Sequence, residues 1–135
     1  MAKKIEKVSK TVTGLELKFE VLLVYLLSFL GFIFAFMKDK DVSEDARFHY
    51  KQSGATFVVY VTLGILEGVL GSFAAMFALT PLFGISILFG VLISLLGLVE
   101  IAVIVFSVIT IVKAFNNQKF EIPLMDKISN LIWKK

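Results

Sequence analysis

A long stretch in the middle of the chain carries almost no charge. Between residues 53 and 112, Glu67 and Glu100 are the only side chains besides Tyr60 that can ionise. A helix needs about 20 apolar residues to cross the roughly 30 Å hydrocarbon core of a bilayer, so the stretch is long enough for two crossings. The sequence Thr-Pro-Leu-Phe-Gly at 80–84 is typical of a turn. We therefore predict a transmembrane helical hairpin.

Small residues recur at helical spacing along both expected helices. They are Gly64, Gly68, Gly71 and Ala75 in the first helix, and Ser86, Gly90, Ser94 and Gly97 in the second. Steps of three and four place each set on one face of its helix. Helices in lipid associate through close backbone contact, which small residues permit. We expect these two faces to pack on each other.

The composition supports a single integral membrane unit over residues 1–135. The chain is 58% hydrophobic, with a mean hydropathy of +0.88, and it has no Cys and one His. Disulfides, thiolate sites and histidine clusters are therefore excluded, and we expect no metal and no cofactor. The net charge of +3 comes from Lys outside the apolar segments. It suits anionic lipid headgroups better than nucleic acid. The expected partners are membrane lipids and either a homo-oligomer or another membrane protein.

The predicted fold is all-α, with three transmembrane helices and interfacial amphipathic helices before the hairpin and at the C-terminus. In order, the segments are a polar leader (1–18), span 1 (19–37), an interfacial helix (43–53), span 2 (54–79), span 3 (87–115) and an interfacial helix (124–135). We treat the first apolar run as a retained span because no small-x-small cleavage site follows it.

The helix that precedes the hairpin holds the only Arg and the only His. Arg47 follows Glu44 by three residues, and His49 follows Asp45 by four, so each has a local carboxylate neighbour on a helix surface. One interpretation is an interfacial helix that leads into the second span. The other is a polar cluster, formed by Arg47, His49 and Gln52, that packs against the membrane segments.

Two motifs carry a family resemblance. Arg47-Phe48-His49-x-x-Gln52 precedes the hairpin, and Lys119-Phe120-Glu121-Ile122-Pro123-Leu124 follows it. In order and spacing they resemble the small prokaryotic membrane proteins of unknown function in the Tic-twenty-like group, which is related to a chloroplast inner-envelope protein-import component. The resemblance covers about residues 20–127. It supports the topology more than an import function, because the import component has an additional span. We expect the first motif to dock on the second, with Phe48 or Tyr50 near Phe120 and Arg47 near Glu121.

The distribution of Lys and Arg predicts the orientation. Five precede the first span, four lie in 38–53, none lie in the hairpin turn, and five lie from 113 onward. With three spans, the positive-inside rule places the motif loop and the C-terminus in the cytoplasm of a multi-pass protein of the inner or plasma membrane. If the N-terminus is cytoplasmic instead, either the first segment is re-entrant or 54–115 crosses three times.

The two intramembrane acids, Glu67 and Glu100, lie at similar distances from the expected turn. They are predicted to face each other, either as a neutral carboxyl pair that joins the helices or as part of a proton or cation pathway. No nucleophile or metal site accompanies them, so an enzyme is not expected.

The predicted function is that of a non-enzymatic membrane scaffold or translocation-associated component, acting through helix packing or oligomerisation. One alternative is a small oligomeric proton or cation conductor that uses Glu67 and Glu100. The other is an interfacial lipid-binding protein that uses its basic amphipathic ends.

Overall fold

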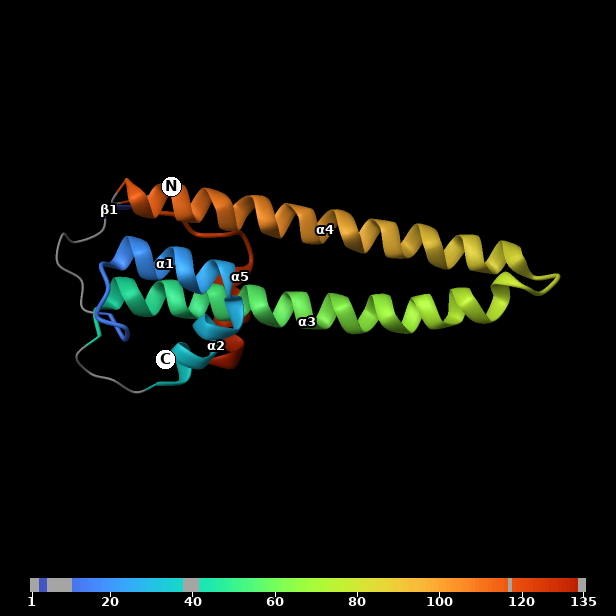
Figure 1. Ribbon diagram of the computed structural model, residues 1–135, viewed down its shortest axis with the longest axis horizontal. Coiled ribbons are helices and arrows are strands. Elements are labelled where there is room, and N and C mark those ends of the chain that lie inside the picture. The colour runs from blue at the N-terminus through green and yellow to red at the C-terminus, as the bar shows by residue number, and fades with distance from the viewer. Residues whose placement is uncertain (1–2, 5–10, 38–41, 117, 134–135) are drawn as a thin grey trace. The chain divides into compact units, whose positions relative to one another are not determined.

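The computed structural model describes residues 3–4, 11–37, 42–116 and 118–133. In chain order its elements are β1 (Lys3–Lys4), α1 (Leu17–Leu26), α2 (Ser28–Phe36), α3 (Glu44–Ala78), α4 (Phe83–Phe115), β2 (Gln118–Lys119) and α5 (Met125–Ile132) (Figure 1). Both α3 and α4 are long and apolar enough to cross a membrane, and α1 with α2 makes a third crossing if the bent pair counts as one span. The predicted all-α membrane fold is confirmed.

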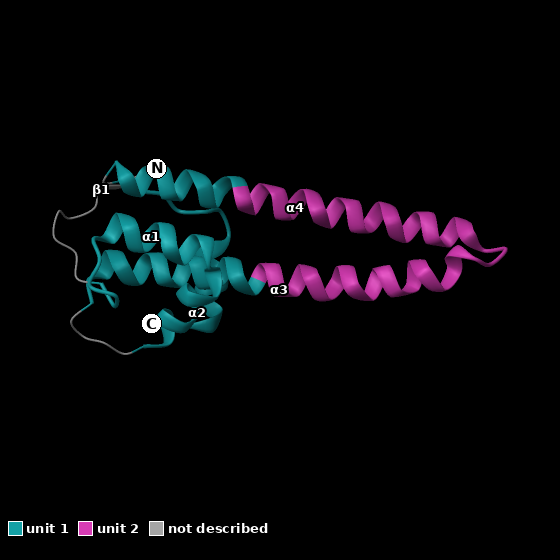
Figure 2. Ribbon diagram, in the orientation of Figure 1, with its two compact units in different colours: residues 1–58, 105–135 teal, residues 59–104 magenta. Residues whose placement is uncertain are grey.

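The chain divides into two compact units (Figure 2). Unit 1 comprises residues 1–58 and 105–135, and unit 2 comprises residues 59–104. Unit 1 contains the short elements and the described part of the polar leader, together with the beginning of α3 and the end of α4. Unit 2 is the remainder of the helical hairpin.

The first apolar segment differs from the single span that was predicted for residues 19–37. It is a pair of helices, α1 and α2, bent by 114° at Leu27. Leu27 has φ −115° and ψ 73°, outside the helical region. A contact with α3 accompanies the bend: the Ser53 hydroxyl donates to the carbonyl oxygen of Val24 near the end of α1. The segment turns so that α2 also packs on α3.

Two glycines permit the crossing of α2 and α3. A Cβ added at Gly54 would lie 2.5 Å from Cη2 of Trp133 and 2.9 Å from Cα of Phe32. One added at Gly31 would overlap the Ser53 side chain. The helix backbones therefore approach as closely as glycine allows, and Trp133 closes the contact from the end of α5.

Helix α3 is continuous from Glu44 to Ala78 and includes both the expected interfacial helix (43–53) and the expected second span (54–79). The Ser43 hydroxyl accepts the backbone N–H of Ala46 at 3.1 Å, which satisfies one of the free donors at the helix start. Residues 53–55 lie within this helix and are buried.

Phenylalanines make the contact between the two helices of unit 2. Phe89 of α4 stacks on Phe73 and Phe77 of α3, with ring centroids 5.7 and 6.5 Å apart. The turn between the helices is held by Thr80, whose hydroxyl donates to the carbonyl oxygen of Phe77 at 2.8 Å and accepts the N–H of Leu82 at 3.2 Å. The predicted position of the turn is confirmed.

The predicted packing of the small residues is not observed. A Cβ added at Gly64, Gly68, Gly71, Gly90 or Gly97 would have no atom within 4 Å outside its own helix backbone. Ala75 is exposed, and the Ser94 hydroxyl donates to Gly90 within the same helix. The two faces of small residues do not pack on each other, because phenylalanine rings rather than glycines fill the space between these helices.

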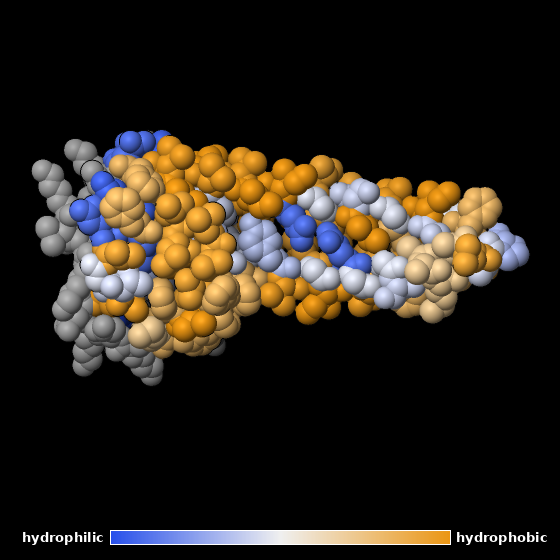
Figure 3. Space-filling view, viewed as in Figure 1, coloured by the Kyte–Doolittle hydropathy of each residue, from blue (hydrophilic) through white to orange (hydrophobic). Residues whose placement is uncertain are grey.

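On the face seen in Figure 3, apolar side chains line the outer sides of the hairpin, and more polar side chains lie along its middle. Ile65 of α3 and Leu98 of α4, for example, are 63% and 62% exposed. Glu67 and Glu100 are half-exposed. Their predicted pairing stays a prediction.

Helix α5 lies within the segment predicted as the last amphipathic helix (124–135), of which 134–135 lie outside the described residues. Its buried face is Met125 and Ser129, continued by Trp133. Leu124 and Leu131 of this segment are 62% and 77% exposed. The helix begins after Leu124, whose positive φ of 69° separates it from Pro123.

Candidate functional site

Buried polar side chains gather in unit 1, where α1 packs against the first turns of α3. Glu20 and His49 are 0% exposed, Tyr50 is 1%, Gln52 is 4% and Tyr25 is 7%. A buried polar group is costly unless it is hydrogen-bonded. The partners of these side chains therefore show which segments are held together in this part of unit 1.

The Glu20 carboxylate connects three segments. One oxygen accepts the Tyr50 hydroxyl of α3. The other accepts both the N–H and the hydroxyl of Thr13, at 2.9 and 2.6 Å. The Tyr50 hydroxyl in turn accepts the N–H of Val12 at 2.9 Å. The segment before α1 is thereby fastened to α3 through a buried carboxylate.

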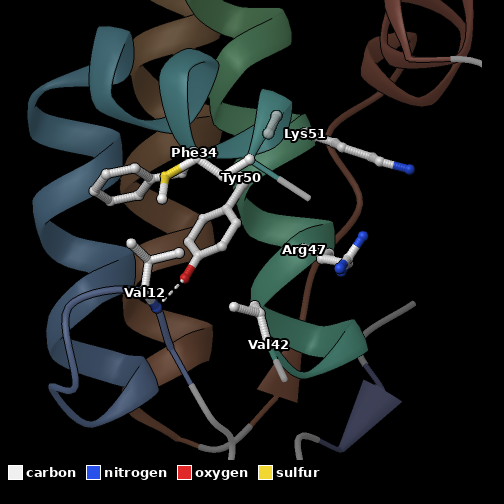
Figure 4. A pocket seen from close by; sticks show the side chains of 8 residues that line it. Val12, Phe34, Val42, Arg47, Tyr50 and Lys51 are labelled. Atoms are coloured by element: carbon white, nitrogen blue, oxygen red, sulfur yellow. Dashed lines mark hydrogen bonds between the residues drawn. The ribbon is translucent and has the colours of Figure 1, made fainter. Parts of the chain in front are cut away.

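A small cavity lies beside this cluster (Figure 4). Its lining residues are Val12, Phe34, Ala35, Met37, Val42, Arg47, Tyr50 and Lys51. Its volume of about 10 Å³ is close to the minimum that holds one water molecule. It is a packing gap next to Tyr50 rather than a ligand pocket.

Gln52 uses both ends of its amide to hold the segment after α4. Its Nε2 donates to the carbonyl oxygen of Phe120 at 3.0 Å and to the Tyr25 hydroxyl at 2.7 Å. Its Oε1 accepts the N–H of Ile122 at 2.8 Å. The predicted docking of the first motif on the second is thus confirmed, although the contact is an amide bridge rather than the expected aromatic pair.

A lysine strengthens the same docking. The ammonium group of Lys119 lies 2.8 Å from the Asp45 carboxylate and 4.8 Å from the centre of the Phe48 ring. Phe120 stacks on Phe106 of α4, with ring centroids 6.3 Å apart, instead of on Phe48 or Tyr50. Pro123 is exposed just before α5.

His49 is enclosed between aromatic rings. Its ring makes edge contacts with Tyr25 and Phe48, and its Nδ1 lies 3.4 Å from the Tyr25 hydroxyl. Its Nε2 is buried and has no hydrogen-bond partner among the described residues. His49 is therefore a core residue of unit 1 and does not face solvent on a helix surface.

A cleft of about 540 Å³ lies between the start of α3 and the segment after α4. Its lining residues are Glu44, Arg47, Phe48, Lys51, Gln52, Lys119, Glu121, Met125, Asp126, Ser129 and Asn130. Charges of both signs share the lining. Within the part of the chain that the structure describes, no three metal-binding side chains come together as a group.

Sequence reasoning found part of this site and missed the rest. Of the motif residues, His49 and Gln52 are buried in the polar cluster, while Arg47 lines both the small cavity and the cleft. Glu20 and Thr13 were not predicted. The signal for Glu20 is an acid inside an apolar run, because such a group needs buried partners.

These features define a multi-pass α-helical membrane protein whose buried polar groups connect α1, α3 and the segment after α4. The chain belongs to the MamF/MmsF family, described as the magnetosome magnetite crystal formation protein family, whose model matches residues 9–129. No curated protein and no solved structure gives a significant match to the chain.

The family corrects two predictions. The resemblance to the Tic-twenty-like group is wrong, because the family that covers nearly the whole chain is the magnetosome family. The two motifs pointed to the wrong family because Gln52 and the 120–122 segment hold the fold together. Contacts that stabilise a fold are compatible with many functions. The predicted functions of scaffold or translocation component, proton or cation conductor, and lipid-binding protein are wrong for the same reason. The predicted partners stay predictions.

Proposed function

We propose that this protein acts in magnetite crystal formation as a multi-pass protein of the magnetosome membrane. The observation that carries the proposal is the family match over residues 9–129. That range includes the buried Glu20 cluster, both motifs and the whole hairpin. The membrane would then be that of the magnetosome rather than the plasma membrane.

The proposed role is not enzymatic. The description of the family names crystal formation and no catalysed reaction. The charged cleft beside α5 contains no cluster of metal-binding side chains among the described residues. We therefore propose that the folded protein influences, from its place in the membrane, how crystals form and grow.

Complementation tests the proposal. The chain is expressed in a magnetite-forming bacterium from which its own member of this family has been deleted, and crystal diameters are measured by electron microscopy. We expect the unsubstituted chain to restore crystal size. A Gln52→Leu variant, which loses the bridge to the 120–122 segment, is expected to restore it less well.

A matched control variant shows whether loss of the Gln52 bridge, rather than substitution as such, changes crystal size. At Gly84 an added Cβ would meet nothing within 4 Å, so Gly84→Ala is expected to restore crystal size fully. Immunoblots of magnetically isolated magnetosomes give the amount of each variant. The proposal would be contradicted if crystal size stays that of the deletion strain although the magnetosome membranes contain the unsubstituted chain.

A further inference from the structure

The bent pair α1–α2 begins and ends at the same part of α3. At its start, Thr13 donates to Glu20, which accepts the Tyr50 hydroxyl of α3. At its end, Met37 lines the same small cavity as Val12 and Tyr50 (Figure 4). The chain therefore leaves the α1–α2 pair beside the same part of α3 at which it entered the pair.

Neither helix of the pair is long enough to cross a bilayer. They contain 10 and 9 residues. At 1.5 Å per residue each is about 15 Å long or slightly less, which is half of a hydrocarbon core of roughly 30 Å. The bend of 114° turns the second helix back past the perpendicular. This is the geometry of a segment that enters a membrane and returns.

The N-terminal strand lies beside the segment that follows α4. β1 pairs antiparallel with β2, with Lys3 opposite Lys119 and Lys4 opposite Gln118. The start of α3 reaches the same segment through Gln52 and Phe120. The beginning of the described chain, the start of α3 and the end of α4 are thus on one side, which requires an even number of crossings.

The charge distribution agrees with this count. All fourteen Lys and Arg residues lie in 1–18, 38–51 and 113–135, and none lies in the 79–82 turn. Two crossings place all fourteen on one side, whereas three would leave the five N-terminal lysines on the other. The positive-inside rule identifies the charged side as the cytoplasm.

We infer that the chain crosses the membrane twice, through α3 and α4, that α1 and α2 form a re-entrant pair on the cytoplasmic side, and that only the 79–82 turn faces the crystal. A helix that crosses a bilayer has its ends on opposite sides, so the turn faces away from the cytoplasm. Its sequence is Leu-Thr-Pro-Leu.

The surface offered to the crystal side is therefore apolar. Iron ions in proteins are held by carboxylate, imidazole or thiolate groups, and the turn has none of them. If the proposed function is right, on which this step rests, the chain affects the crystal through other membrane proteins or the bilayer and does not coordinate iron there.

Single-cysteine labelling tests the topology, since the chain has no Cys of its own. Leu15→Cys, Leu79→Cys and Asn116→Cys place one thiol each in the N-terminal segment, the turn and the end of α4, at exposed positions. Each full-length variant is expressed in a bacterium that forms no magnetosomes and is treated with a membrane-impermeant maleimide in spheroplasts and in inverted membrane vesicles. We expect Leu79→Cys to react only in spheroplasts, and the other two only in inverted vesicles.

Leu15→Cys and Asn116→Cys reacting from opposite sides would overturn the re-entrant pair, and all three reacting from the reverse sides would overturn the orientation. Fusions of green fluorescent protein and of alkaline phosphatase to either end of the unsubstituted chain give a second measurement. Both ends should fluoresce and lack phosphatase activity, and ends that report opposite sides would contradict the topology. If the crystals do not respond to the chain but the labelling is as expected, the proposed function is wrong and the topology stands.

Discussion

The side-chain amide of Gln52 lies against the backbone of Phe120, with Nε2 3.0 Å from the carbonyl oxygen. The other end of the amide accepts the N–H of Ile122 at 2.8 Å. One buried side chain thus satisfies two backbone groups of a segment that follows α4. In this way the start of α3 fixes the path of the chain into α5.

Replacing Gln52 by leucine should destabilise the protein by about 1–3 kcal/mol, because the part-buried carbonyl of Phe120 and the buried N–H of Ile122 lose their partner. Thermal unfolding in detergent measures the effect, and limited proteolysis should show new cleavage near 116–124. Ser72→Ala is the control, since that exposed hydroxyl bonds only within its own helix. Equal melting temperatures and equal cleavage for Gln52→Leu and the unsubstituted chain would contradict the bridge.

Alanine at two glycines should have opposite effects. At Gly54 a Cβ would lie 2.5 Å from Trp133 and 2.9 Å from Phe32, so Gly54→Ala should lower the melting temperature. At Gly68 a Cβ would meet nothing within 4 Å. Gly68→Ala should therefore stabilise the helix by up to about 1 kcal/mol or leave it unchanged. If Gly68→Ala is the more destabilising of the two, the small-residue stripe does pack in the native protein.

Tyr50→Phe should loosen the segment before α1. The substitution removes the hydroxyl that donates to Glu20 and accepts from Val12. Hydrogen exchange of the Val12 and Thr13 amides should become faster, with a loss of stability of about 1–3 kcal/mol. Leu15→Ala is the control, because it changes an exposed side chain of the same segment. Exchange that accelerates equally in both variants would show that Tyr50 has no special role.

The apolar turn should tolerate polar substitution. In the complementation assay, a Leu79→Ser, Leu82→Ser double variant should give the same crystal diameters as the unsubstituted chain, because neither side chain binds iron or is buried. Crystal size is compared at equal amounts of protein in the magnetosome fraction. Smaller crystals at equal protein would mean that the two leucines make a required contact on that side.

The sequence was sufficient to predict the hairpin, its turn and the docking of the two motifs. Apolar length determines how many helices a chain can place in a bilayer, and Thr80 with Pro81 marks a turn by local chemistry alone. Gln52 was singled out because it belongs to the first motif and to the polar cluster with Arg47 and His49. The hairpin and its turn depend on composition and on neighbours that are close in sequence, whereas the docking joins residues 68 and 70 positions apart and was predicted from the two motifs.

The bend at Leu27 and the role of Glu20 could not be predicted in the same way. Neither proline nor glycine marks the bend, which coincides with contacts to Ser53 and Gly54 from another helix. Glu20 is buried because Thr13 and Tyr50 close over it. The glycine stripes misled for a related reason: a glycine permits close approach, but its partner is decided by the fold. Gly31 and Gly54, outside the stripes, make the close contacts.

The contact at Gly54 has a consequence for biosynthesis. It joins Phe32, Gly54 and Trp133, which the ribosome produces in that order and far apart in time. When α3 reaches the insertion machinery, Trp133 has not yet left the ribosome, and the face of Gly54 that it covers is still open. The crossing of α2 and α3 can form early, but its closure by Trp133 must follow insertion. The hairpin therefore enters the lipid before unit 1 is complete.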